Sequence, residues 1–196
     1  MERRVNLPRK QPKQARSQTT VEAILEATAR ILAAEGRARL STNRVAEVAG
    51  VSVGSLYQYF PNKDALLAEL RRRYDQQFMD RMLRKLGRLG SLPLGEAIAE
   101  FVRFMVGLHL ENPKLHNELS VEIPDLQRDT LRAFALAYLE AHRDEVRPRD
   151  LELASYVSVE AGEALVHQTA LHEPERLRDE AFVEEVCDLL LRYLAK

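Results

Sequence analysis

The sequence predicts an all-α fold, in which a small N-terminal head of three helices precedes a larger helical body. Apolar residues recur at the helical spacing along most of the chain, and stretches that alternate with a period of two are hard to find. Glycine and proline are few, with eight of each among 196 residues. A composition of 45% hydrophobic and 30% charged residues is ordinary for a globular chain that buries a core.

Breaks in the helical pattern divide the chain into four segments. Pro8 and Pro12 discourage helix in the basic N-terminal arm. The clearest boundary lies between Gly87 and Gly95, a stretch that holds three glycines and Pro93. We therefore expect a flexible basic arm over 1–16, a head over 17–63, a connecting helix over 64–86 and a body over 87–196.

Helices are expected wherever an apolar stripe lies between such breaks. Gly36 follows the first of them and is expected to cap its C-terminus. Asn62 is expected to cap the connecting helix at its N-terminus. Outside residues 41–61, the expected helices cover about 17–34, 62–86, 94–111, 114–121, 126–145, 150–171 and 177–194.

Residues 41–61 predict two short helices joined by a tight turn. A hydroxyl at Ser41 or Thr42 caps the first helix, and Gly50 ends it with a left-handed residue. Ser52 then caps a second helix, which we expect over about 53–59. Two short helices with a glycine turn form a helix-turn-helix.

The outward face of the second short helix indicates what the motif binds. Leu56 is expected to pack inward together with Val51. Small residues at the N-terminal end of such a helix let its backbone approach base edges, and hydroxyl or amide donors beside it bind phosphates. The side chains expected to point outward are small, polar or aromatic: Val53, Gly54, Ser55, Gln58 and Tyr59.

The segment VAEVAGVSVGSLYQYFPNKDALL, preceded by ILEATARILAAEG, resembles the DNA-binding domain of the TetR family of bacterial transcriptional regulators. The ordered run Gly-Val-Ser-x-Gly-x-Leu-Tyr-x-Tyr-Phe-x-x-Lys is more specific than a bare helix-turn-helix pattern. The resemblance implies that base edges face Val53, Gly54 and Ser55. It implies that phosphates contact Thr42, Tyr57, Tyr59 and Lys63. Further DNA contacts are expected from Asn43, Arg44 and Gln58.

The distribution of charge agrees with a polyanionic partner at one end of the chain. Eleven basic and five acidic residues lie within 1–63, so this segment has a net charge of +6, whereas the rest carries −7 within a total of −1. The basic arm is expected either to follow phosphates or the minor groove, or to act as a flexible solubilising tail.

The last two expected helices are candidates for a dimer interface. Small and apolar residues recur on them at helical spacing, namely Ala154, Ser158, Ala161, Gly162 and Leu165, then Phe182, Val186, Leu189, Leu190 and Tyr193. Periodicity alone leaves open whether these stripes close the protein's own core. The resemblance implies that they pair with a second subunit as a four-helix bundle, which would give a homodimer.

The middle helices are expected to enclose a regulatory pocket, again by resemblance. A mostly apolar cavity with a few polar groups suits a small lipophilic ligand. The alternative is that the aromatic residues are ordinary core and the charged residues are solvated. The expected lining is Phe101, Phe104, Met105, Leu108, His109, Phe134, Tyr138, Tyr156, Glu160, Glu163 and His167.

The sequence contains no motif for catalysis or metal binding. Five histidines are present, but HExxH, CxxC and compact carboxylate-histidine patterns are absent. A glycine-rich phosphate loop and a nucleophile elbow are also absent. Cys187 is the single cysteine of this sequence, so an intramolecular disulfide is excluded. We expect Cys187 to be a small core residue, and the alternative is a redox-sensing thiol. We expect no enzyme activity, no cofactor and no metal.

Together these features predict a homodimeric, ligand-responsive transcriptional regulator, most simply a repressor that binds a near-palindromic double-stranded DNA operator. A small, largely apolar effector would release it. No signal peptide or membrane span is visible in the sequence, so a cytoplasmic location is expected. The alternative is a helical ligand-binding or scaffold dimer whose basic head meets a membrane or protein, which leaves the helix-turn-helix unexplained.

Overall fold

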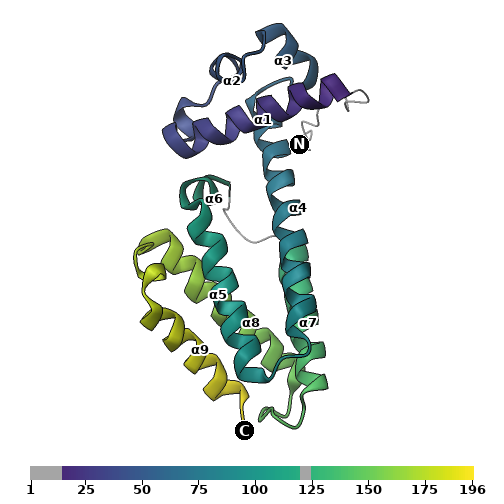
Figure 1. Ribbon diagram of the computed structural model, residues 1–196, viewed down its shortest axis with the longest axis vertical. Coiled ribbons are helices and arrows are strands. Elements are labelled where there is room, and N and C mark those ends of the chain that lie inside the picture. Colours follow the sequence, from purple (N-terminus) through teal and green to yellow (C-terminus); the bar gives the residue numbers. More distant parts are fainter. Residues whose placement is uncertain (1–14, 120–124) are drawn as a thin grey trace, which may run out of the picture. The chain divides into compact units, whose positions relative to one another are not determined.

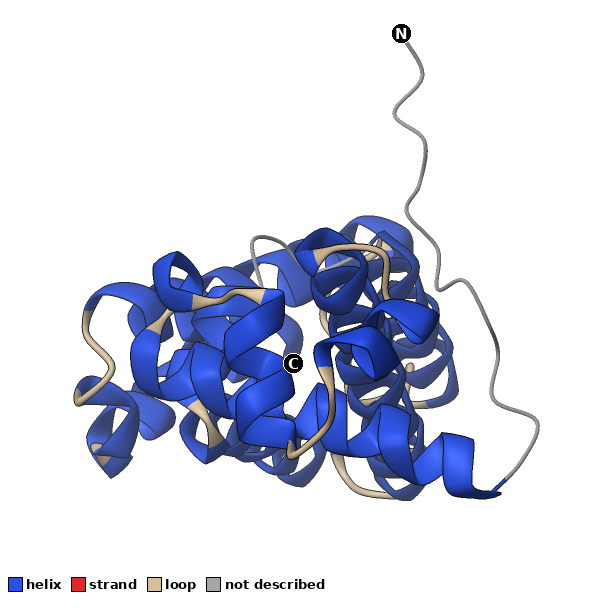
Figure 2. Cartoon of the chain, turned by 90° about the horizontal axis from the view of Figure 1, so that it is seen from above, coloured by secondary structure: helices blue, strands red, loops and turns tan. Residues whose placement is uncertain are grey.

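The computed structural model describes residues 15–119 and 125–196 (Figure 1). Within these ranges every regular element is a helix, as the sequence predicts (Figure 2). The chain divides into two compact units. We call residues up to Phe78 together with 114–121 the head, and residues 79–113 together with 122–196 the body.

The head is built around one apolar core. Ile24, Val45, Leu56 and Leu66 are fully buried in it, and Leu119 joins the same cluster. The short α6 is therefore part of the head core, although the sequence placed it in the body. The elements of the head are α1 (Ala15–Glu35), a 3₁₀ turn (Arg37–Arg39), α2 (Thr42–Ala49), α3 (Val53–Tyr59), the first part of α4 (Lys63–Leu89) and nearly all of α6 (Pro113–Leu119).

The ends of α1 differ in how well the sequence predicted them. Gly36 follows α1 with a φ of 76°, and its N–H donates to the carbonyl of Leu32 at 3.1 Å. A side chain is strained at this φ, so glycine suits the helix end. At the other end, Ala15 and Arg16 are already helical, whereas they were expected in the arm. Residues 1–14 of that arm lie outside the described residues.

The body is a bundle in which α5 packs against α8 and α9, and α7 packs against α8. Val102, Val166, Val186 and Leu194 are buried in it. No helix in the described parts of the chain is long and apolar enough to cross a lipid bilayer. Its elements are the second part of α4, α5 (Leu94–Glu111), α7 (Asp125–Ala141), α8 (Leu151–His172), a 3₁₀ turn (Arg176–Arg178) and α9 (Glu180–Leu194).

Two helix ends in the body depart from the expected bounds. Helix α4 continues through Gly87 to Leu89, since an exposed glycine inside a helix costs only about 1 kcal/mol. Helix α7 ends at Ala141 rather than near Glu145. The carboxylate of Glu145 instead accepts a hydrogen bond from the N–H of Leu94 at 3.1 Å, at the start of α5. That backbone group has no partner within its own helix.

Candidate functional site

Side-chain caps fix the geometry of α2, the turn and α3. The hydroxyl of Ser41 accepts a hydrogen bond from the N–H of Arg44 at 3.2 Å, and the hydroxyl of Ser52 accepts one from the N–H of Ser55 at 3.0 Å. Gly50 between them is left-handed, with a φ of 66°. The predicted helix-turn-helix is confirmed, with Ser41 as the first cap.

The exposed face of α3 begins with small side chains. Leu56 is 0% exposed and holds α3 on the head core, whereas Val53 is 39% exposed. Gly54 and Gln58 are exposed, and Ser55 is half-buried. This first turn lets the helix backbone approach another molecule closely, as base readout in a major groove requires.

Two of the predicted phosphate contacts are hydrogen-bonded to each other across the turn. The hydroxyl oxygens of Thr42 and Tyr57 lie 3.1 Å apart. Each hydroxyl has one O–H to donate, and the pair uses only one of them, so one donor remains for a phosphate oxygen. Lys63 begins α4 and is exposed, and its side chain makes no hydrogen bond or ion pair with the described residues. Its ammonium group is therefore available to a phosphate.

The remaining predicted DNA contacts differ in how exposed they are and in whether they already pair with other residues of the head. Asn43 is exposed in the first turn of α2, and Tyr59 is half-buried against the head core. The guanidinium of Arg44 lies 3.0 Å from the carboxylate of Glu47 and 3.1 Å from that of Glu35. Hydrogen bonds and charge from these two carboxylates raise its pKa. Arg44 is thus partly neutralised by the head itself.

The body has an apolar cavity of about 110 Å³, partly open to solvent, between α4, α5, α7, α8 and α9. The hydroxyl of Tyr138 donates to the carbonyl of Leu92 at 2.6 Å, and burial raises its pKa to about 12. Five residues of the predicted lining face the cavity: Phe101, Met105, Phe134, Tyr138 and Glu163.

The other six predicted pocket residues do not line this cavity. Tyr156 is exposed, with its ring under the guanidinium of Arg132 at 4.7 Å. Glu160 forms an ion pair with the same Arg132. The ammonium of Lys85 lies 6.0 Å from the ring of Phe104. Outside the cavity are Phe104, Leu108, His109, Tyr156, Glu160 and His167.

Small and aliphatic residues make up most of the lining that the sequence did not indicate. Ala97 and Ala135 belong to this group, and nothing in their residue type suggests a binding function. Only their position on the inner faces of α5 and α7 could have indicated that they line the cavity. The further lining residues are Leu86, Leu89, Leu94, Ala97, Ile98, Val102, Leu131, Ala135, Leu139, Ser158, Val159, Gly162, Val166, Leu190 and Leu194.

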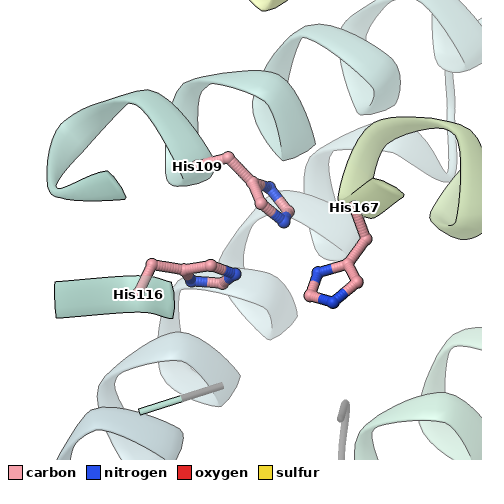
Figure 3. Close-up of side chains that lie close together, drawn as sticks. All are labelled: His109, His116 and His167. Carbon is pink, nitrogen blue, oxygen red and sulfur yellow. The ribbon is translucent and has the colours of Figure 1, made fainter. Parts of the chain in front are cut away.

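His109 and His167 meet inside the body (Figure 3), with ring centroids 5.7 Å apart and planes at 67°. The Nδ1–H of His109 donates to the carbonyl of Met105 at 2.9 Å. Burial lowers the pKa of His109; the bond to Met105 opposes this shift, and the neighbouring imidazole of His167 adds to it. The His109 imidazole is therefore neutral at neutral pH.

This lowered pKa predicts how the stability of the body depends on pH. His109 in the unfolded chain takes up a proton near pH 6.5, whereas the folded body resists protonation until a lower pH. We therefore expect the free energy of unfolding to decrease as the pH falls below 6.5. Denaturant titrations at pH 7.5 and 5.5 measure this decrease, and an NMR titration follows the His109 ring. A ring that titrates at or above pH 6.5 would contradict the assignment.

The stripes predicted as a dimer interface divide between core and surface. Ala154, Val186 and Leu190 are buried within the body, and a Cβ atom at Gly162 would lie 3.5 Å from Leu190. Ala154, Val186 and Leu190 therefore belong to the core of a single chain, which is the alternative that periodicity left open. Leu165 and Leu189 are exposed. Half-buried positions are Ser158, Ala161, Phe182 and Tyr193.

Two family models match the chain. Residues 24–70 match the model described as bacterial regulatory proteins, TetR family. Residues 93–194, more than half of the chain, match the tetracyclin repressor-like C-terminal domain. The chain belongs to the TetR family. It is a transcriptional regulator and not an enzyme, and TetR regulators bind DNA and small-molecule ligands and form dimers.

The TetR-family chain is also similar to individual known proteins. An uncharacterized HTH-type transcriptional regulator of Haemophilus influenzae is 43% identical over 58 residues; the match spans 30% of this chain and 31% of that relative. A TetR-family regulator structure from the same organism has a TM-score of 0.58 at 21% identity, covering 93% of this chain and all of that one.

The fold is also similar to that of SmeT, the repressor of the Stenotrophomonas maltophilia multidrug efflux pump SmeDEF. That structure has a TM-score of 0.64 at 21% identity and covers 92% of each chain. A structure of the SmeT-triclosan complex has the same TM-score of 0.64 at 20% identity, over 91% of this chain and 93% of that one.

Proposed function

We propose that this TetR-family regulator is a repressor that binds a near-palindromic operator as a homodimer. A small, largely apolar effector releases it from DNA. The main support is the exposed first turn of α3, where Val53, Gly54 and Ser55 leave the backbone accessible. Such a regulator acts on the bacterial chromosome, so we place it in the cytoplasm.

DNA readout in this proposal separates two kinds of contact. The first turn of α3 faces base edges, where Val53 offers apolar contact and Ser55 a hydroxyl. Thr42, Tyr57 and Lys63 fix the register on phosphates. Because Val53 and Gly54 have no polar side chain, sequence preference also depends on DNA shape.

A homodimer supplies the specificity that one small head lacks. Two recognition helices about 34–36 Å apart read half-sites on one face of the duplex. Helices α8 and α9 pack against each other and expose large apolar side chains at Leu153, Val157, Leu165 and Leu189. We assign the subunit interface to these four residues, which we call the α8/α9 face. Their exposure in a single chain supports the assignment.

The effector site is the apolar cavity of the body. A ligand there shifts DNA binding only if it has different affinities for the DNA-binding and the released conformation. The SmeT-triclosan complex is a precedent for a small aromatic ligand on a protein of this fold. Apolar lining from five helices suits a ligand of similar character.

Removal of Lys63 tests the phosphate contacts. Lys63→Ala is expected to weaken binding to specific and random duplexes alike, and to reduce the slope of log K against log salt by about one per protomer. Arg149→Ala removes the same charge from an exposed position in the body and should leave the slope unchanged. Fluorescence anisotropy across a salt series measures both variants. Equal slopes in wild type and Lys63→Ala would argue against a phosphate contact at Lys63.

A further inference from the structure

The cavity of the body has a single charged residue in its lining. Nineteen of its twenty lining residues are uncharged, and Glu163 on α8 is the exception. The Glu163 side chain is half-buried. A carboxylate beside so much apolar surface is not needed to bind a purely apolar ligand.

The hydroxyl groups in the lining already donate to the protein. Tyr138 donates to the carbonyl of Leu92 at 2.6 Å, and Ser158 donates to the carbonyl of Ala154 at 2.7 Å. Neither O–H is left to donate to a ligand. The lining side chains can therefore only accept hydrogen bonds from a ligand, and the carboxylate of Glu163 is the strongest acceptor among them.

Glu163 has no counter-ion within the described residues. Its carboxylate makes no ion pair or hydrogen bond with them, whereas the carboxylate of Glu160, almost one turn earlier on α8, pairs with Arg132 and Arg128. A half-buried carboxylate without a cation loses solvation and receives no compensating charge. A cation placed in the cavity would supply that charge.

We propose that the effector is a small monocationic amphiphile whose protonated amine pairs with Glu163 while its apolar part fills the cavity. This inference rests on the proposed effector function of the same cavity. The rings of Phe101, Phe134 and Tyr138 also line the cavity, and their faces attract a cation. The charge and the aromatic lining therefore favour the same class of ligand.

The size of the cavity limits the ligand. Its volume of about 110 Å³ leaves room for a ligand several times larger than one water molecule. Amphiphiles with a chain of about eight carbons are small enough to serve as probes of such a site. Octylammonium, 1-octanol and octanoate share such a chain and differ in the charge of the head group, so we choose them as probes.

The test compares the three probes on three proteins by isothermal titration calorimetry at pH 7, where the amine is protonated. In wild type, octylammonium should bind about tenfold more tightly than 1-octanol, and octanoate should bind least tightly. Glu163→Gln, which keeps the side-chain shape, should remove the tenfold preference and leave 1-octanol unchanged. Glu152→Gln removes an exposed carboxylate from the same helix outside the cavity and should behave as wild type.

The outcomes separate this inference from the proposed function. Two results would overturn the proposal of a cationic effector while leaving the cavity a ligand site. One is that 1-octanol binds wild type as tightly as octylammonium does, and the other is that Glu163→Gln weakens the binding of both probes equally. If none of the probes binds, the cavity is not the effector site, and the proposal of a cationic effector is overturned as well. Release of bound DNA by octylammonium is measured separately, and tight binding without release would overturn the effector role alone.

Discussion

Leu56→Ala is expected to lower the free energy of unfolding of the head by about 3 kcal/mol. Leu56 is 0% exposed and is the buried residue of α3. Truncation leaves a cavity where the recognition helix attaches to the head core. A loss of this size lowers the melting temperature of a unit of 60–100 residues by about 15 °C, and DNA binding is lost with the fold.

Circular dichroism and DNA binding measured over the same temperature range test this prediction. Leu56→Met nearly conserves volume and should cost less than about 1.5 kcal/mol. Gln58→Ala, at an exposed position of the same helix, should leave the melting temperature within about 2 °C. A melting temperature of Leu56→Ala equal to that of wild type would contradict the attachment of α3 through Leu56.

The double variant Leu153→Glu/Leu189→Glu is expected to be monomeric and to bind its operator at least about 100-fold more weakly. Leu153 is 56% exposed and Leu189 is 52% exposed in the single chain. In the proposed dimer they are buried, where an unpaired carboxylate is strongly unfavourable. Separate subunits also lose the gain in affinity that comes from joining two half-site contacts.

Sedimentation and operator titrations on the same samples measure this effect. Leu83→Glu is the matched control, because Leu83 is 51% exposed on α4 and lies outside the α8/α9 face. It should remain dimeric and bind DNA as wild type does. A double variant that stays dimeric would place the interface on another surface.

Local chemistry made the head predictable from its sequence. Ser41, Gly50, Ser52 and Asn62 end or begin helices as predicted, each through a hydrogen bond or a left-handed φ. These interactions span at most four residues, so a single sequence contains all the information that they need. The same reasoning gave the bounds of α5 correctly.

Contacts between distant helices explain where the structure of the body departs from the sequence-based expectations. Gly162 was assigned to the subunit interface because it is small, yet it packs against Leu190 of the same chain and lines the cavity. Glu160 was assigned to the pocket, but Arg132 on α7 pairs with it. Periodicity shows that a face is apolar or polar without showing which partner covers it.

The regulator account is tested most directly by selecting bound sequences from a random duplex library at moderate salt. Wild type, Lys63→Ala, Tyr57→Ala and the control Arg149→Ala are run in parallel. We predict an enriched inverted repeat that wild type and Arg149→Ala bind equally and that the other two variants bind more weakly. Equal retention of all sequences, with no enriched repeat, would contradict specific DNA recognition by α3.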